Sequence, residues 1–342
     1  MRFQENVDLA NFSTMALGGK VRYLVRVSNE TELVEAISFA KANKLHSIII
    51  GEGSNIVWQD GLFEGLVIVN DINYFDIHKE TSNSYLLTVG AGEIWDKIVE
   101  QSTSEELSGI EALSLIPGKT GATPIQNVGA YGQEISQSLV NIRGYDALEN
   151  KFLTIDNKNC GFGYRTSRFK TSERGRFYVT KVELRLKKTN PEPPFYKDVT
   201  NYFNDQKITD FTPETVRQAV IQIRKHKLPD PKTIHNCGSF FANPLISQES
   251  EQRLKTLFPD LVSWPTDNGL FKVSAAWLIE KAGYKNYHDQ ETGMATWKNQ
   301  PLVLVNEHAK STNDLLLFKE KIVSVVQSRF GIELQQEPEL LP

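Results

Sequence analysis

Apolar and polar residues alternate from Val21 to Val27, which predicts a strand with one buried face. After this strand, Ser28 to Glu30 offers capping side chains, and apolar residues then recur every three or four positions. This spacing predicts a helix that continues through Lys44. The unbroken apolar run from Ile48 to Ile50 predicts a second strand that is buried on both faces.

The same two periods continue along the chain, with no internal repeat and no low-complexity segment. Alternating or wholly apolar runs predict strands, and periods of three to four predict helices. The expected strands cover about 66–70, 85–89, 140–145, 177–186 and 302–305, and the expected helices cover about 93–106, 212–226, 270–281 and 313–330. The proline-rich segment 190–194 interrupts this pattern and is the clearest linker.

Composition and charge narrow the class of protein. A chain of 342 residues is long enough for two or three domains. Its net charge of -4 gives no basic field for nucleic acid, so an anionic ligand has to meet local Arg and Lys clusters. The two cysteines form no disulfide framework, and no spacing resembles a metal site. Without an apolar signal region or an apolar run of about 18 residues, we expect a cytoplasmic protein that binds neither membrane nor nucleic acid.

A glycine turn, Gly51 to Asn55, directly follows the second strand. Glycine lets backbone N–H groups approach phosphate oxygens closely, so this turn is a candidate phosphate site. It is not the dinucleotide fingerprint, because Gly61 and Gly65 argue against the helix that must follow. The later Gly118 does not belong to a P-loop either, because Leu113 stands where that motif needs glycine.

The segment 115–132 holds four glycines and two prolines among hydroxyl and amide side chains, so it cannot form a regular element. Loops of this length in a compact domain are usually functional. Gln126 and Asn127 suit ring heteroatoms or a ribose, and Tyr131 offers a flat surface. The segment therefore predicts a site for a large polar cofactor, with an extended surface loop as the alternative.

Two further stretches present polar groups beside aromatic rings. Phe162 to Arg165 ends in a guanidinium, which grips a carboxylate or phosphate at two points, although an arginine stacked on a surface ring fits equally well. The stretch 236–244 has neither a helical nor a strand period, and it packs Ser239 between Cys237, two amides and two phenylalanines. It suits either a pocket with an apolar wall or a structural loop, and Cys237 suits a small buried position.

Taken together, these stretches resemble the UDP-N-acetylenolpyruvoylglucosamine reductase family, flavoenzymes that complete UDP-N-acetylmuramate for bacterial peptidoglycan and thus for cell-wall biogenesis. The matching motifs keep the family's order over nearly the whole chain: Gly51-Glu-Gly-Ser-Asn55, Ile116-Pro-Gly118, Pro124-Ile-Gln-Asn-Val-Gly-Ala-Tyr-Gly132, Phe162-Gly-Tyr-Arg165, Lys227-Leu-Pro-Asp-Pro231 and Gly238-Ser-Phe-Phe241. The segment 284–288 agrees with the longer form of the family.

The resemblance implies an α+β protein with a vanillyl-alcohol-oxidase-like FAD-binding fold of two α+β subdomains, followed by a C-terminal α+β substrate-binding domain. The implied parts are FAD-binding subdomains at 1–70 and 71–190, a linker at 191–211, the substrate-binding domain at 212–331 and a C-terminal segment at 332–342 that returns to the active site. It also implies non-covalent FAD, NADPH as co-substrate, no metal and a monomer.

In that family NADPH reduces FAD, and flavin N5 then delivers hydride to C3 of the enolpyruvyl sugar nucleotide. Hydride addition moves negative charge onto C2 and its carboxylate, so the enzyme needs an electrostatic clamp and a proton. The resemblance implies Arg165 as the clamp, Ser239 as the proton donor to C2 and Glu339 as the carboxylate that completes the site. Glu337 is the alternative inward carboxylate. Because a serine hydroxyl is a poor acid in water, Ser239 needs nearby charge, which the resemblance places on Glu339 and Lys227.

The resemblance also implies two sets of contacts. Flavin contacts are expected from Gly51, Gly53, Ser54, Asn55, Ile116, Pro117, Gly118, Thr123, Pro124, Gln126, Asn127, Gly129, Ala130, Tyr131, Gly132 and Arg224. Substrate contacts are expected from Tyr196 over the uridine diphosphate, from Lys227 and Asn243 on the diphosphate side, and from Gln300 near the phosphates or the sugar. Another FAD-dependent oxidoreductase of the same fold and a non-catalytic nucleotide-sugar-binding flavoprotein are the alternatives. The joint presence of Arg165, Ser239 and Glu339 favours the reductase.

Overall fold

The structure is a computed structural model that describes residues 1–266 and 268–342. The chain divides into two compact units, and each unit combines several segments of the chain. The first unit comprises Met1–Val7, Val21–Glu52 and Phe63–His226, and the second comprises Asp8–Lys20, Gly53–Leu62 and Lys227–Pro342. Among the helices of the described residues, none is long and apolar enough to cross a membrane.

The N-terminal sheet of the first unit has the strand order β1-β2-β5-β3. Its strands are β1 (Gln4–Asp8), β2 (Lys20–Val27), β3 (Ser47–Ile50) and β5 (Leu62–Asn70). β3 and β5 are parallel, with Ser47 opposite Leu66. The helix α1 (Glu30–Ala42) buries the apolar face that its period predicts, and its core cluster also contains β2 and β5 residues. The Asn29 side chain caps α1 by accepting a hydrogen bond from the Glu32 N–H at 2.9 Å.

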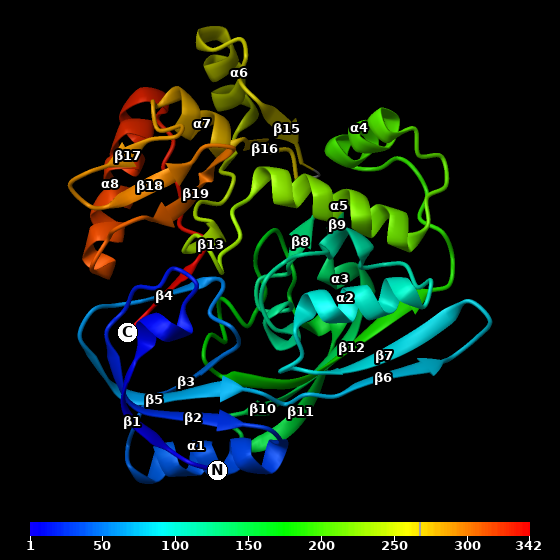
Figure 1. Cartoon of the computed structure of the whole chain (residues 1–342), viewed down its shortest axis with the longest axis vertical. Coiled ribbons are helices and arrows are strands. Elements are labelled where there is room, and N and C mark those ends of the chain that lie inside the picture. The colour runs from blue at the N-terminus through cyan, green and yellow to red at the C-terminus, as the bar shows by residue number, and fades with distance from the viewer. Residues whose placement is uncertain (267) are drawn as a thin grey trace. The chain divides into compact units, whose positions relative to one another are not determined.

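The second sheet of the first unit is antiparallel, with the order β11-β10-β12-β7-β6 (Figure 1). Its strands are β6 (Phe75–Lys79), β7 (Ser84–Gly90), β10 (Leu139–Asp146), β11 (Lys151–Asp156) and β12 (Phe177–Lys187). The helices α2 (Trp95–Ser104) and α3 (Ile135–Ser138) contribute to the core of this sheet. The helices α4 (Lys197–Gln206) and α5 (Pro213–Lys227) share a separate apolar cluster.

The second unit contains a four-stranded antiparallel sheet of order β13-β19-β18-β17. Its strands are β13 (Asn236–Ser239), β17 (His288–Asp289), β18 (Met294–Trp297) and β19 (Gln300–Asn306). The helices α7 (Ala275–Lys281) and α8 (Thr312–Phe330) bury their apolar residues in the core of this unit. A smaller sheet joins β14 (Leu245–Ile246), β16 (Phe271–Val273) and β15 (Ser263–Pro265), and α6 (Gln248–Leu257) follows β14.

The C-terminal residues of the chain form a strand instead of fraying. In the second unit, β20 (Glu339–Leu341) pairs in parallel with β4 (Ile56–Trp58), and Glu339 lies opposite Ile56. Figure 1 shows this red C-terminal segment beside the blue β4. The pairing joins the last residues of the chain to the glycine turn that precedes β4, so two segments far apart in sequence become neighbours.

Two sequence-based element predictions are wrong. The expected helix at 270–281 is a strand, β16, followed by α7, because the Ser274 side chain accepts a hydrogen bond from the Trp277 N–H and starts the helix there. The stretch 236–244 was expected to have no regular structure, but its first residues form β13. This strand pairs with β19 through an irregular register, which a residue pattern does not reveal.

Candidate active site

The glycine turn after β3 needs glycine for a steric reason. Gly53 has a φ of +71°, and a Cβ at this position would lie 2.0 Å from the Phe12 carbonyl oxygen. In the first unit, the Glu52 carboxylate accepts a hydrogen bond from the Gly118 N–H at 3.1 Å. This bond joins the two glycine-rich segments, although 66 residues separate its partners.

The segment 116–132 is packed into the first unit and is not an extended surface loop. Thr120, Thr123 and Asn127 are buried, and the Gly121 N–H donates to the Ala91 carbonyl at 2.9 Å. A Cβ at Gly121 would lie 2.5 Å from the Ala91 Cβ, so the close approach requires glycine. The short elements in this region are a 3-10 turn at Thr120–Ala122 and the strands β8 (Gly129–Ala130) and β9 (Gln133–Glu134).

Lys119 anchors the start of this segment to the end of β5. Its ammonium donates to the Asn70 carbonyl oxygen at 2.5 Å and to the Asp71 carboxylate. The Lys119 side chain is 9% exposed, and Asp71 also pairs with Arg26 at 2.8 Å. Lys119 and Arg26 hold the pKa of Asp71 below its usual range despite the opposing effect of burial. Buried charges of opposite sign in hydrogen-bonding geometry are costly to break, so this contact fixes the segment in place.

Asn127 shapes the same segment with its side chain. It has a φ of +49°, and its amide group donates to the Glu134 carboxylate at 2.8 Å and to the Gly163 carbonyl at 3.1 Å. Its side-chain oxygen accepts from the Ser136 N–H at 3.1 Å. These bonds use each polar atom of the amide, so Asn127 holds the backbone that a ligand would meet.

Arg165 lies beside this segment in the first unit. Gly163 and Thr166 exchange two backbone hydrogen bonds, and Arg165 occupies the turn between them with a φ of +54°. Its Nη2 donates to the Gly129 carbonyl at 2.6 Å. The Ser167 hydroxyl also donates to the Ile125 carbonyl at 2.6 Å. The structure therefore brings two of the predicted site elements together.

Arg224 projects from α5 in the first unit and lacks an ionic partner within the described residues. As a whole residue it keeps some exposure, but its Nε is buried and has no hydrogen-bond partner there. Burial lowers the pKa of Arg224, and the Tyr131 hydroxyl is its hydrogen-bonding neighbour. Tyr131 in turn makes an edge contact with Tyr196, with ring centroids 5.6 Å apart. A guanidinium whose buried Nε has no hydrogen-bond partner in the described residues suits an anionic ligand.

Arg217, two turns earlier on α5, provides a contrast. It pairs with Asp96 through two hydrogen bonds of 2.6 and 3.2 Å. Asp96 also accepts a hydrogen bond from the Leu115 N–H at 2.6 Å. One arginine of the helix is therefore structural and compensated, and the other is not.

In the second unit, Ser239 ends β13 opposite Val303. Gly238, with a φ of +75°, precedes it, and the buried Asn236 side chain accepts from the Gly238 N–H at 2.9 Å. The Asn236 amide also donates to the Ile234 carbonyl at 2.7 Å. Ser239 is partly exposed, and its hydroxyl makes no hydrogen bond within residues 1–266 and 268–342. The backbone before Ser239 is thus fixed by its neighbours, whereas the described residues make no hydrogen bond to the hydroxyl.

The residues around Ser239 differ from the expected pocket wall. Phe240 and Phe241 are almost fully buried and belong to the core of the second unit, where their rings pack edge to face. The expectation that they form an apolar pocket wall is therefore not met, because the core takes both rings. Cys237 is also buried, and burial raises the pKa of its thiol.

The two candidate carboxylates lie on the C-terminal segment of the second unit. The Glu339 N–H donates to the Asn55 carbonyl at 3.0 Å, and the Glu337 N–H donates to the Phe240 carbonyl at 2.9 Å. One backbone contact thus reaches the glycine turn, and the other reaches the residue after Ser239. Both glutamates are partly buried.

Asn243 and Gln300 of the second unit have oriented amides. The Asn243 side-chain oxygen accepts from the Ala275 N–H at 2.9 Å, at the start of α7. The Gln300 side-chain oxygen accepts from the Leu302 N–H at 3.4 Å. In both residues the side-chain oxygen accepts a backbone hydrogen bond, so the NH2 group is the part of the amide that remains available as a donor among the described residues. Lys227 lies at the end of α5 in the same unit, whereas Tyr196 of the first unit precedes α4 and is 47% exposed.

Several residues of this region were missed by the sequence reasoning. Asn236, Lys119 and Glu173 support the candidate groups through hydrogen bonds and ion pairs, but each is an ordinary polar residue in the sequence. Only the motif positions next to them gave a signal. No group of three or more His, Cys, Asp or Glu side chains that could hold a metal occurs in the part of the chain that the structure describes.

Comparisons with known proteins find relatives that cover nearly the whole chain. A family model described as UDP-N-acetylenolpyruvoylglucosamine reductase, C-terminal domain, matches residues 230–341, and one described as FAD binding domain matches residues 21–149. UDP-N-acetylenolpyruvoylglucosamine reductase of Cupriavidus pinatubonensis is 37% identical over 339 residues, covering 99% of both chains. The enzyme of the same name from Escherichia coli is 35% identical and covers 97% of this chain and 95% of its own.

A solved structure supports the fold independently. The crystal structure of UDP-N-acetylenolpyruvylglucosamine reductase from Thermus caldophilus has a TM-score of 0.69 and 22% identity, and the match covers 100% of each chain. At this identity the likeness concerns the fold. Together with the FAD-binding match, it confirms the predicted fold class, α+β with an FAD-binding fold of the vanillyl-alcohol-oxidase type.

Proposed function

The chain belongs to the UDP-N-acetylenolpyruvoylglucosamine reductase family, and from that premise we propose that Arg165, Ser239 and Glu339 are its catalytic groups. The protein is an FAD-dependent oxidoreductase with NADPH as reductant. It reduces UDP-N-acetylglucosamine enolpyruvate to UDP-N-acetylmuramate, a peptidoglycan precursor. The observation that carries this function is the 37% identity over 99% of the chain.

The protein groups that would hold FAD fit a pyrophosphate with a flat ring system. A side chain at Gly53 would clash with the Phe12 backbone, so this turn requires glycine. Hydrogen bonds from Lys119 and Asn127 hold the 116–132 segment in its conformation. The uncompensated charge of Arg224 supplies a counter-charge for the pyrophosphate. When bound, the flavin takes two electrons from NADPH and supplies a hydride to the enolpyruvyl group.

Hydride transfer moves negative charge toward the substrate carboxylate, and Arg165 stabilises that charge. Its Nη2 is held by the Gly129 carbonyl, which fixes the plane of the guanidinium. A planar fork held in advance stabilises a developing carboxylate charge without reorganising during the reaction. A side chain at position 129 would disturb this arrangement, because a Cβ on Gly129 would lie 3.0 Å from the Arg165 Nη1.

Ser239 donates the proton to C2. Its hydroxyl has no protein hydrogen bond within the described residues, so the O–H bond is available to point at the substrate carbon. A free serine hydroxyl is too weak an acid to do this alone. Glu339, at the end of the chain, completes the site as the group that takes a proton from solvent and passes it to the Ser239 oxygen after the transfer to C2.

The nucleotide sugar is bound by donors that suit its phosphates. The NH2 groups of Asn243 and Gln300 and the ammonium of Lys227 provide these donors on the second unit. Tyr196 offers its exposed ring to the uridine diphosphate. We further propose that the protein works as a cytoplasmic monomer without a nucleic-acid or membrane partner.

A single spectroscopic experiment tests this function. The purified protein is expected to be yellow, to lose its flavin absorbance with NADPH under anaerobic conditions, and to regain it on addition of the enolpyruvyl sugar nucleotide. Regain of colour only on admission of oxygen would indicate another flavin oxidoreductase of the same fold. Retained colour that NADPH does not bleach would indicate a non-catalytic flavoprotein.

A further inference from the structure

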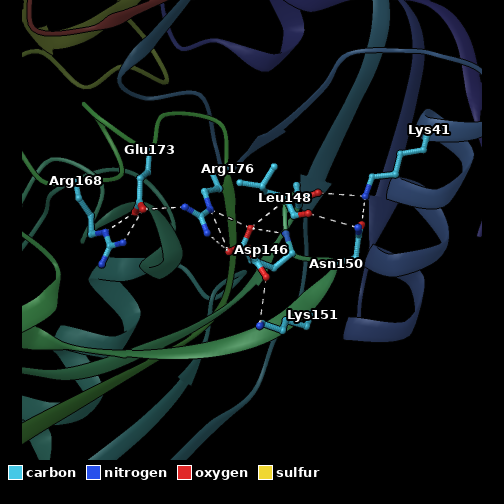
Figure 2. Close-up of polar contacts among 10 residues, drawn as sticks. Lys41, Asp146, Leu148, Asn150, Lys151, Arg168, Glu173 and Arg176 are labelled. Carbon is cyan, nitrogen blue, oxygen red and sulfur yellow. Dashed lines mark hydrogen bonds and ion pairs between the residues drawn. The ribbon is translucent and has the colours of Figure 1, made fainter.

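The segment behind the Arg165 turn is held by a chain of alternating charges. The residues between β11 and β12 contain short turns but no long helix or strand, so side chains have to set the shape of this segment. Arg168, three residues after Arg165, forms a two-pronged ion pair with Glu173, with its Nη2 2.6 Å from Oε1 and its Nε bonded to Oε2. Figure 2 shows this pair at one end of the chain of contacts.

Glu173 also binds the next cation. The Arg176 Nη1 donates to the Glu173 Oε1 at 3.0 Å, and the Arg176 Nη2 donates to the Asp146 Oδ2 at 2.6 Å. The side chain of Asp146 is 0% exposed and that of Glu173 is 14% exposed. Arg176 lowers the pKa of Asp146 to about 2, so the carboxylate stays charged at neutral pH. The four side chains therefore alternate in sign from Arg168 to Asp146 (Figure 2).

At its Asp146 end, this chain of charges contacts the backbone of the turn between β10 and β11. Asp146 ends β10 and accepts from the Leu148 and Glu149 N–H groups at 2.9 and 3.1 Å. Lys41 of α1 donates to the Ala147 carbonyl at 3.2 Å and also bonds to Asn150 in the same turn (Figure 2). These contacts thus connect α1 and the turn between β10 and β11 to a segment that has little regular structure.

The near end meets the Arg165 turn. The Arg168 N–H donates to the Cys160 carbonyl at 2.9 Å, and the Ser167 hydroxyl donates to Ile125 in the 116–132 segment. Arg165 itself holds Gly129 in that segment. The 116–132 segment therefore contacts the Arg165 turn directly, and Glu173 contacts it through Arg168.

We propose that Glu173 is a positioning residue that sets the orientation of the Arg165 guanidinium through Arg168. The inference rests on the proposed role of Arg165 in the second half-reaction. A purely stabilising ion pair would be the alternative, but exposed pairs contribute little, whereas Glu173 is shielded and bound on both sides. A small displacement of a clamp is costly for the rate, because the fork has to match the substrate carboxylate closely.

The test compares Glu173→Gln with the control variant Glu149→Gln. Glu149 pairs with Lys151 on the neighbouring hairpin, with both side chains about half exposed, so loss of its charge is expected to change neither half-reaction. For Glu173→Gln we expect flavin content and the rate of reduction by NADPH within about twofold of the wild type. The rate of reoxidation by the enolpyruvyl substrate should fall about tenfold, an effect of the size expected from misplaced catalytic groups.

A double-variant cycle with Arg165→Lys separates positioning from general stability. If Glu173 acts through Arg165, then Glu173→Gln should lower the reoxidation rate by less than about twofold in the Arg165→Lys background. Arg168→Gln removes the other partner of the same ion pair and should reproduce the effect. It therefore also tests the inference if Glu173→Gln folds poorly. A full tenfold loss in the Arg165→Lys background, or equal losses in both half-reactions, would overturn the positioning role. Unchanged reoxidation by Arg165→Lys itself would instead overturn the role of Arg165, and this inference with it.

Discussion

The 116–132 segment of the first unit and the surroundings of Ser239 in the second use their polar side chains in opposite ways. In the first, Asn127 and Lys119 bond to the protein with nearly every polar atom they have. In the second, Ser239, Asn243 and Gln300 are held in place but keep donors that have no partner among the described residues. A cofactor that stays bound is served by a pre-shaped cradle, whereas a substrate that comes and goes is served by oriented donors that it alone completes.

This difference gives the two regions different sensitivities. Changes in the 116–132 segment and around it should alter flavin retention or the position of Arg165. Changes near Ser239 should leave the flavin and its reduction by NADPH intact and alter the step with the sugar nucleotide. The variants that follow are chosen to separate these outcomes.

The largest effect is expected for Ser239→Ala. Removal of the proposed proton donor should slow reoxidation of the flavin by the enolpyruvyl substrate roughly 10²- to 10⁴-fold, the range typical of a lost general acid. Reduction by NADPH should remain near normal, because it needs no proton from this hydroxyl. Stopped-flow absorbance of the two half-reactions measures both rates.

Ser324→Ala is the matched control for this variant. Ser324 lies on the exposed face of α8 in the same unit, and its hydroxyl donates to the Glu320 carboxylate at 3.3 Å. It should behave as the wild type in both half-reactions. If Ser239→Ala damaged both half-reactions equally, its hydroxyl would be structural and the contrast between the two regions would fail.

A smaller effect is expected from a pair of variants on one helix, Arg224→Met and Arg217→Met. Arg224 has no ionic partner in the described residues, so its loss should hardly change the stability of the protein without flavin but should weaken FAD binding roughly 30-fold or more. Loss of Arg217 leaves Asp96 unpaired and should lower the free energy of unfolding by on the order of 2 kcal/mol, below the figure for a fully buried pair because Asp96 is 27% exposed. Flavin titration and urea unfolding measure the two quantities.

The opposite pattern in this pair would contradict the assignment of Arg224. Strong destabilisation by Arg224→Met with unchanged FAD affinity would make Arg224 the structural arginine of α5. An unchanged affinity in both variants would mean that the counter-charge for the pyrophosphate comes from elsewhere.

The smallest effect is expected from two glycine substitutions three residues apart. A Cβ at Gly129 would lie 2.9 Å from the Glu134 Cγ and 3.0 Å from the Arg165 Nη1, so Gly129→Ala should displace Arg165 and raise the KM for the sugar nucleotide several-fold. Gly132 has a φ of +88° and open space around it, so Gly132→Ala should cost only about 1 kcal/mol of stability from backbone strain. Steady-state kinetics and thermal unfolding distinguish them, and an equal KM for both variants would argue against a contact between Gly129 and Arg165 during binding.

Prediction of helices and strands from the sequence succeeded where residues close together along the chain determine the element. The period of α1 and the apolar run of β3 report on neighbouring residues, and both elements were found with their ends shifted by a few residues. The expected burial of β3 on both faces was wrong, because β3 is an edge strand and Ile50 alone among its residues is buried. The expectation failed at 270–281, where a capping serine divides one apolar stretch into a strand and a helix. It left two alternatives open for Phe240 and Phe241, because whether an aromatic ring lines a pocket or fills a core depends on residues far away in sequence.

The candidate site shows the same division. The roles proposed for Arg165, Ser239 and Glu339 come from the resemblance, which rests on the order of the motifs in the sequence. Glu173, Asn236 and Lys119 were not identified from the sequence, because each acts through one hydrogen bond or ion pair that exists only after folding.

The sequence by itself therefore determined which family the protein resembles, which groups we propose as catalytic and where most of its strands and helices lie. Only the tertiary structure decided which of the two α5 arginines is compensated and which polar atoms remain available to a ligand. It also placed the last strand of the chain beside the glycine turn at Asn55. The physical reason is that composition and period are properties of neighbours along the chain, whereas satisfaction of charges and hydrogen bonds depends on partners that folding brings from a distance.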